Sequence, residues 1–132
     1  MVDPTVVNPE LGGIDGLRRL ARVAHDAGLG LVADIVPNHL GVEVPRRNRW
    51  WWDVLKHGQG SDYAHFFDID WAEDNGAGGK IALPVLGAPG DTDALKLEHL
   101  DDEGVLTYYD HVFPLAPGSY AGLDDDPAAV HE

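Results

Sequence analysis

The chain has 132 residues, with 23 acidic side chains against 9 lysines and arginines, and a formal net charge of −14. Binding to nucleic acid or to an anionic membrane requires many cationic side chains, which this acidic chain lacks. Neither is therefore an expected partner. The absence of cysteine excludes disulfides and thiolate chemistry, and no apolar run approaches the ~20 residues that span a bilayer. The first residues lack the basic and apolar stretches of a signal peptide, so cytoplasm is the expected location.

The first 41 residues have the pattern of an α/β unit. Apolar side chains recur at three- and four-residue steps from Ile14 to Ala27, which predicts an amphipathic helix. Gly28 is its expected left-handed C-terminal residue. The following run, Leu29–Val36 (LGLVADIV), is almost continuously apolar apart from Asp34, which favours a strand buried on both faces of a parallel sheet. The chain offers no partner strands for it.

From Gly41 onward the chain consists of short segments separated by turns, which predicts a second, mainly β and loop-rich region over residues 42–132. A short helix is expected over Asn48–Lys56, ended by Gly58, and the tail after Pro114 is expected to be loosely ordered because it is rich in proline, glycine and aspartate. The expected strands are Phe66–Trp71, Lys80–Leu86 with an edge or bend at Pro84, and a β-hairpin of Leu95–Leu100 and Val105–Tyr109 around the turn at 101–104.

The hexapeptide Asp34–His39 (DIVPNH) is the most informative segment for function. A carboxylate near the C-terminal end of a buried parallel strand is costly unless it is paired or used, and ligand sites of α/β folds lie at that end. Asp34, Asn38 and His39 together offer donors and acceptors, which sugar hydroxyls require. In the alternative interpretation, Asp34 caps a loop and His39 is a satisfied core histidine, and the spacing alone does not separate the two.

A strand followed by D-x-x-x-N-H, after a helix and a glycine turn, resembles the first signature segment of the alpha-amylase family. Five further strings, in order and over nearly the whole chain, are similar to those of the maltooligosyl trehalose synthases within that family. They are VNPELGG (7–13), WWWDVL (50–55), YAHFFDIDW (63–71), KIALPVLG (80–87) and YYDHVFPLAPG (108–118).

The resemblance implies a fold class. A (β/α)₈ barrel needs ~250 residues, so this chain cannot close one by itself. Residues 1–41 are expected to be a barrel segment, namely a helix and the third strand. Residues 42–132 are expected to be the domain inserted after that strand, which forms one wall of the substrate cleft.

The resemblance also implies roles for the DIVPNH residues. Asp34 would support the site at the end of the third strand, His39 would hydrogen-bond the glucose unit at the bond being broken, and Asn38 would hold the strand-to-loop turn. In some amylases the equivalent asparagine binds calcium, but no confirming cluster of oxygen ligands is visible here, so a metal is not favoured. No cofactor is expected.

Catalysis is expected to depend on residues outside this chain. Retaining enzymes of this family use a carboxylate nucleophile and a carboxylic acid/base ~5–5.5 Å apart. The resemblance places both beyond Glu132, so no catalytic residue is assigned. Asp68 and Asp70 would lie on one face of a strand ~6.5–7 Å apart, but we reject them as a catalytic pair in favour of hydrogen bonds to loops and solvent.

The aromatic triplet Trp50–Trp52 is a second candidate for sugar contact, because aromatic faces stack on sugar rings. Consecutive helical side chains point about 100° apart, so we expect two rings in the core and one exposed. Trp52 and Tyr63 are taken as substrate-binding candidates. The histidines have no i,i+4 pairing on a helix, so zinc is unsupported, and the basic triplet Arg46, Arg47 and Arg49 is interpreted as a solvated loop.

The predicted function is that of a stretch of a maltooligosyl trehalose synthase, whose substrate is a maltooligosaccharide. Two alternatives stay open: another alpha-amylase-family glycosidase, or a non-catalytic maltooligosaccharide-binding module. Because residues 14–36 present apolar faces without partners, self-association or partial disorder of residues 1–41 is also expected.

Overall fold

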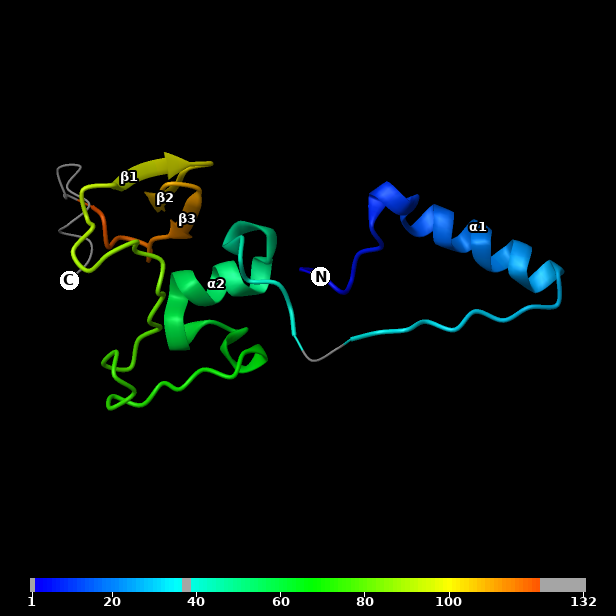
Figure 1. Cartoon of the computed structure of the whole chain (residues 1–132), viewed down its shortest axis with the longest axis horizontal. Helices are drawn as coiled ribbons and strands as arrows, with labels where there is room; N and C mark the ends of the chain where they lie inside the picture. The colour runs from blue at the N-terminus through cyan, green and yellow to red at the C-terminus, as the bar shows by residue number, and fades with distance from the viewer. Residues whose placement is uncertain (1, 37–38, 122–132) are drawn as a thin grey trace. The chain divides into compact units, whose positions relative to one another are not determined.

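A computed structural model describes residues 2–36 and 39–121 (Figure 1). The chain divides into two compact units, residues 1–41 and residues 42–132, and each is described by itself. Together they contain helices and an antiparallel sheet, so the chain is of a mixed α/β class. No helix within the described ranges is long and apolar enough to cross a membrane.

Helix α1 (Gly13–Asp26) is the main element of the first unit, and it confirms the helix predicted from apolar spacing. It follows a 3-10 turn, η1 (Pro9–Leu11), whose cap Asn8 accepts a hydrogen bond from the Glu10 amide at 3.0 Å. Gly28 closes the helix at φ 74°, a left-handed conformation that favours glycine. The apolar stripe of α1 is largely exposed, with Leu17 43% and Leu20 55% accessible.

The strand predicted over Leu29–Val36 is not formed. The segment is extended but belongs to no sheet, and it is exposed along its length, Val32 to 98%. A strand is defined by hydrogen bonds to a neighbour, and the described part of the first unit contains no second strand to supply them. The apolar run is therefore present without the sheet that would bury it.

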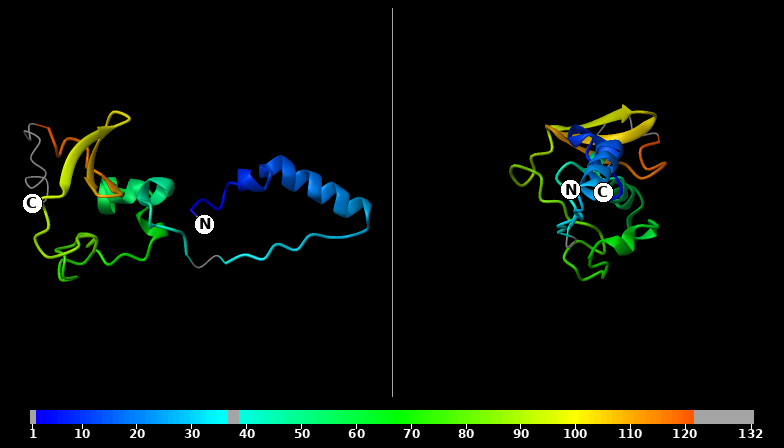
Figure 2. Two further views of the ribbon diagram at one scale, coloured as in Figure 1. Left: turned by 45° about the horizontal axis from the view of Figure 1, so that its top comes forward. Right: turned by 90° about the vertical axis from the view of Figure 1, so that its right-hand side faces the viewer.

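The second unit contains a three-stranded antiparallel sheet in the order β1-β2-β3 (Figure 2). Strand β1 (Leu95–Leu100) pairs with β2 (Glu103–Tyr108), which confirms the predicted hairpin. Strand β3 (His111–Pro114) pairs with β2 on its other side and was not predicted.

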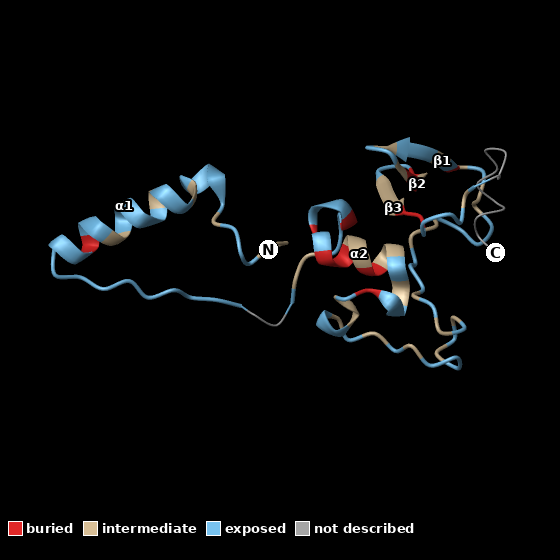
Figure 3. Ribbon diagram, turned by 180° about the vertical axis from the view of Figure 1, so that it is seen from behind, coloured by how far each residue is buried: buried red, intermediate tan, exposed pale blue. Residues whose placement is uncertain are grey.

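Helix α2 (Arg49–His57) packs against β3 and confirms the second predicted helix, which ends at Gly58 as expected. The core of this unit lies along α2 and β2: Val54 and Val105 are 0% and 1% exposed (Figure 3). Phe66 and Phe67 cover the other side of α2, with their rings 6.2 Å from Trp50 and 5.0 Å from Trp51, respectively.

Two predicted strands, Phe66–Trp71 and Lys80–Leu86, are wrong. The first follows a short 3-10 turn, η4 (Ala64–Phe66), and both segments are irregular and belong to no sheet. Their polar groups bond locally: the Asp70 carboxylate accepts the Ala72 amide at 2.9 Å. The sequence predicted strands here because alternating apolar and polar residues are typical of a half-buried strand. The same alternation also occurs in irregular segments that have no partner strand.

Candidate functional site

Helix α2 positions the aromatic triplet. Asn48 is fully buried and caps the helix, accepting the Trp51 amide on its side-chain oxygen at 3.1 Å. Trp50 and Trp51 are each 8% exposed and belong to the core, whereas Trp52 is half-buried. The two expected core rings are therefore confirmed, whereas the third ring, that of Trp52, is half-buried and not fully exposed.

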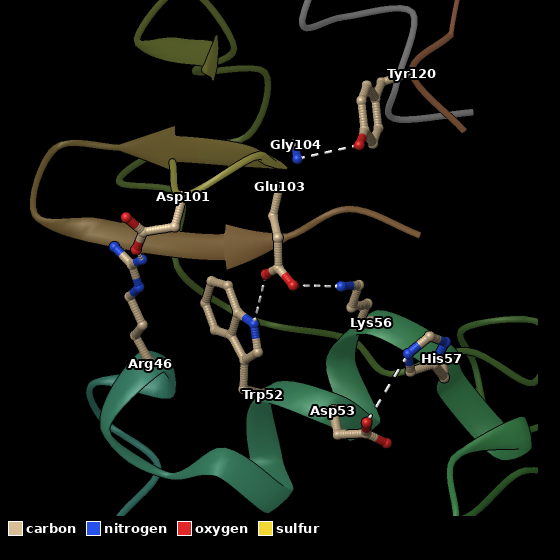
Figure 4. A network of polar contacts seen from close by, with 9 residues as sticks. All are labelled: Arg46, Trp52, Asp53, Lys56, His57, Asp101, Glu103, Gly104 and Tyr120. Carbon is tan, nitrogen blue, oxygen red and sulfur yellow. Dashed lines mark hydrogen bonds and ion pairs between the residues drawn. The ribbon is translucent and has the colours of Figure 1, made fainter. Parts of the chain in front are cut away.

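The Trp52 indole is held by a carboxylate from the sheet (Figure 4). Its Nε1 donates to Glu103 Oε2 at 3.3 Å, while the Lys56 ammonium donates to Glu103 Oε1 at 2.6 Å. Lys56 stands one helical turn after Trp52, so both side chains reach the same carboxylate. Glu103 thus fixes the edge of the ring and joins α2 to β2.

These hydrogen bonds stabilise the ionised form of Glu103. The hydrogen bond from Lys56 is the largest cause that lowers the pKa of the Glu103 carboxyl below its ordinary value, with partial burial opposing it and the Trp52 hydrogen bond assisting. The carboxylate is therefore charged at neutral pH and acts as a hydrogen-bond acceptor, which suits a structural role better than that of a proton donor.

Arg46 lies beside the same ring. Its guanidinium carbon is 6.0 Å from the Trp52 ring centroid, and it forms an ion pair with Asp101 at the hairpin turn. Arg49 stacks over Trp50 at 4.7 Å. The basic triplet is exposed, as predicted. Two of its guanidinium groups nevertheless pack on aromatic rings, a contact that the prediction of a solvated loop did not include.

Tyr63 lies in the turn before η4. It is half-buried, with its ring 5.5 Å from that of Phe66, and its amide donates to Ser61 Oγ at 3.1 Å. Ser61 Oγ in turn donates to Asp53 at 2.5 Å, and His57 Nε2 lies 3.9 Å from the other Asp53 oxygen. Because the serine hydroxyl faces the carboxylate and not the imidazole, this group does not form a nucleophilic triad.

The DIVPNH residues belong to the first unit. Asp34 and His39 are exposed, and Asn38 lies outside the described residues. The structure brings Trp52 together with Glu103, Lys56 and Arg46, and it brings Tyr63 together with Ser61 and Phe66. The substrate-binding roles expected of Asp34, Asn38, His39, Trp52 and Tyr63 stay predictions. Within residues 2–36 and 39–121, no group of three or more His, Asp or Glu side chains is arranged to hold a metal ion.

Sequence reasoning missed a second polar contact, which anchors the loop before the hairpin. The Tyr108 hydroxyl donates to Asp91 Oδ2 at 2.6 Å and accepts the Gly87 amide at 2.8 Å. The hydrogen bond to the Asp91 carboxylate is the main cause that raises the pKa of Tyr108, because it favours the protonated phenol. The partners lie 17 and 21 residues away in sequence, so no short motif could have indicated them.

Comparisons with known proteins show what this chain is similar to. No family model matches the chain. A Mycobacterium tuberculosis protein named as a maltooligosyl trehalose synthase is 48% identical over 132 residues, which is all of this chain and 16% of that relative. The solved maltooligosyltrehalose synthase of Arthrobacter ramosus is similar over 99% of this chain and 16% of its own, at 49% identity and a TM-score of 0.82. Over its whole length the chain matches a stretch of maltooligosyl trehalose synthases.

A more distant synthase has the same local fold. A Sulfolobus tokodaii protein described as a maltooligosyl trehalose synthase matches 95% of this chain and 16% of its own, at 37% identity and a TM-score of 0.75. The chain therefore corresponds to one continuous stretch of these synthases and spans about a sixth of their length.

Proposed function

We propose that the chain is a cleft-forming stretch of a maltooligosyl trehalose synthase. The whole enzyme would rearrange the reducing-end α-1,4 link of a maltooligosaccharide into an α,α-1,1 link by intramolecular transglycosylation. The observation that carries the proposal is the 48% identity over all 132 residues to a relative of that name. No catalytic residue is assigned to this chain. Its role would be to bind and orient the substrate and to exclude water from the cleft.

The first unit would supply a barrel helix and strand. Its apolar side chains support this, because Leu29, Val32 and Ile35 are 65%, 98% and 69% exposed in a segment that is already extended. Such a run is stable in a folded enzyme only when neighbouring strands cover both of its faces. In that setting Asp34, Asn38 and His39 would follow the strand at the edge where barrel enzymes place substrate.

The second unit would form the domain inserted after that strand and one wall of the cleft. Trp52 supports this, since its ring is partly accessible and is held at one edge by Glu103. The reaction requires that the released glucose, and not water, attacks the glycosyl-enzyme intermediate. A wall with rigid aromatic side chains would exclude water from that step.

A segment exchange with the Arthrobacter ramosus synthase tests the proposal. The matching stretch of that enzyme is replaced by these 132 residues, and conversion of maltopentaose into a non-reducing product is followed. We expect the chimera to form the product, and Asp34→Asn to lower its kcat/KM by about tenfold or more through misplaced substrate. Asp26→Asn, at the exposed C-terminal end of α1, is the matched control and should leave activity unchanged.

Two results would contradict the proposal. The first is a chimera that melts cooperatively near the temperature of the parent enzyme yet forms no product. The second is turnover of maltopentaose by the isolated 132-residue chain, because that would place complete catalytic machinery in it.

A further inference from the structure

The second unit contains a pocket of about 350 Å³ that the site described above does not use. It lies where α2 and the turn after it meet the loop of residues 71–83 and strand β3. Small-ligand pockets are typically about 300–1,000 Å³. The volume is therefore at the lower end of that range and fits one sugar ring better than an extended chain.

The walls combine apolar surface with two polar side chains. Leu55 and Phe113 contribute to the apolar part, together with the half-buried indole of Trp71. Gln59 and Lys80 add an amide and an ammonium group. An aromatic face beside polar groups matches a hexose, whose ring has an apolar face and an edge of hydroxyl groups.

The loop that carries Trp71 and Lys80 is held by one side chain. The Asn75 amide nitrogen donates to the Asp70 and Lys80 carbonyls at 2.8 and 3.1 Å. Its side-chain oxygen accepts the amides of Ala77 and Gly79 at 2.7 and 3.2 Å. These hydrogen bonds bring the backbone of residues 70 and 80 together at the base of the loop, so Trp71 and Lys80 both extend from this closed base.

The charge of the lining favours a neutral ligand. No acidic side chain lines the pocket, and the Lys80 ammonium has no ion-pair partner within the described ranges. A single cation in a chain of net charge −14 attracts an anion poorly, because the surrounding field is repulsive. It remains a good donor to a sugar hydroxyl.

We propose that this pocket binds one glucose unit of a maltooligosaccharide, with the ring stacked on Trp71 and hydroxyl groups bonded to Lys80 and Gln59. The ligand class rests on the proposed function. The pocket itself rests on the geometry of the second unit. Trp71 and Lys80 are therefore sugar-binding residues in addition to the candidates named from the sequence.

The test uses the indole N–H signals of the four tryptophans in ¹H–¹⁵N spectra of the 132-residue chain, assigned by single Trp→Phe variants. Titration with maltotriose should shift the Trp71 signal along a saturable curve, with a Kd of about 1–10 mM, as is expected for a contact with a single sugar ring. Trp71→Ala and Lys80→Met should each raise the Kd by about tenfold. In both variants the Kd is followed in the backbone amide signals of Gln59 and Gly79, which line the same pocket, because Trp71→Ala removes the indole signal. Lys96→Met, an exposed lysine on β1, is the matched control and should leave the Kd unchanged.

The outcomes separate the pocket from the proposed function. Saturable binding that is weakened about tenfold in Trp71→Ala supports the pocket, even if the segment-exchange chimera is inactive. A maltotriose titration that shifts no Trp71 signal up to about 50 mM, or binding that is unchanged in both pocket variants, would overturn it even if the chimera is active. Far-UV circular dichroism of each variant verifies that the chain is folded.

Discussion

The Lys56 ammonium lies 2.6 Å from a carboxylate oxygen of Glu103, which connects helix α2 to the middle strand of the sheet across 47 residues of sequence. The same carboxylate accepts the Trp52 indole N–H, so one side chain sets both the packing of α2 on the hairpin and the edge of an accessible aromatic ring. The Lys56 and Glu103 side chains are 20% and 41% exposed, so water screens the pair only in part.

We expect this ion pair to contribute measurably to stability. A double-mutant cycle with Lys56→Met and Glu103→Gln should give a coupling energy of about 0.5–1 kcal/mol by urea unfolding, because partly buried pairs exceed exposed ones. Arg46→Met with Asp101→Asn is the control cycle at the same hairpin, where the side chains are 43% and 84% exposed. Its coupling should be smaller. Equal coupling in the two cycles would show that burial does not strengthen the Lys56 pair.

The same carboxylate should make the second unit sensitive to acid. The folded-state pKa of Glu103 is lowered from its ordinary value of 4.5, so its contribution is complete above about pH 4.5 and is lost as the pH falls through the lower folded pKa. We therefore expect the Tm difference between the unsubstituted chain and Glu103→Gln to be largest near pH 6 and to shrink below pH 4.5. A difference that stays constant across this range would contradict the assigned pKa shift.

Local signals in the sequence located the elements that depend on neighbouring residues. The α1 and α2 helices follow apolar spacing and end at Gly28 and Gly58, and both glycines have the positive φ that such helix ends favour. The β1-β2 hairpin surrounds an acidic turn sequence. In each of these elements, the spacing of apolar residues and the position of turn or cap residues within about a dozen residues determine the backbone conformation.

Elements that depend on distant partners were predicted poorly. The run Leu29–Val36 has strand composition, yet a strand also needs neighbours, and residues 2–36 and 39–121 contain none that pairs with it. Strand β3 was missed because its turn is Tyr109-Asp110, where Tyr109 adopts φ 49° in place of the usual glycine or asparagine. Within the candidate site, Trp52 was identified from composition, whereas Glu103, 51 residues away, carried no signal that could associate the two.

The cap of α2 should be important for its stability. Replacing Asn48 by alanine leaves the Trp51 amide without its side-chain acceptor at a position that is 0% exposed. We expect a loss of about 1–2 kcal/mol in urea unfolding followed by tryptophan fluorescence. Asn48→Ser retains a capping oxygen and should recover part of that loss. If the serine and alanine variants are equally stable, the cap does not contribute in this helix.

The hairpin turn can be improved by a single substitution. Asp101 and Asp102 are the two central residues between β1 and β2, and both adopt positive φ, 51° and 65°, as in a type I′ turn. Asp102→Gly removes the steric cost of that conformation while leaving the ion pair between Asp101 and Arg46 intact. We expect a gain of about 0.5 kcal/mol in the free energy of unfolding, since the relief exceeds the added flexibility of glycine in the unfolded chain.

Two variants separate the backbone effect from the charge effect at this turn. Asp102→Asn removes the charge but keeps a side chain that tolerates positive φ, so it should change stability little. Asp102→Ala removes the charge and keeps the steric cost without a side chain that can hydrogen-bond locally, so it should be less stable than either. Equal stability of the alanine and glycine variants would show that charge, and not the left-handed backbone, sets the cost of Asp102 in this turn.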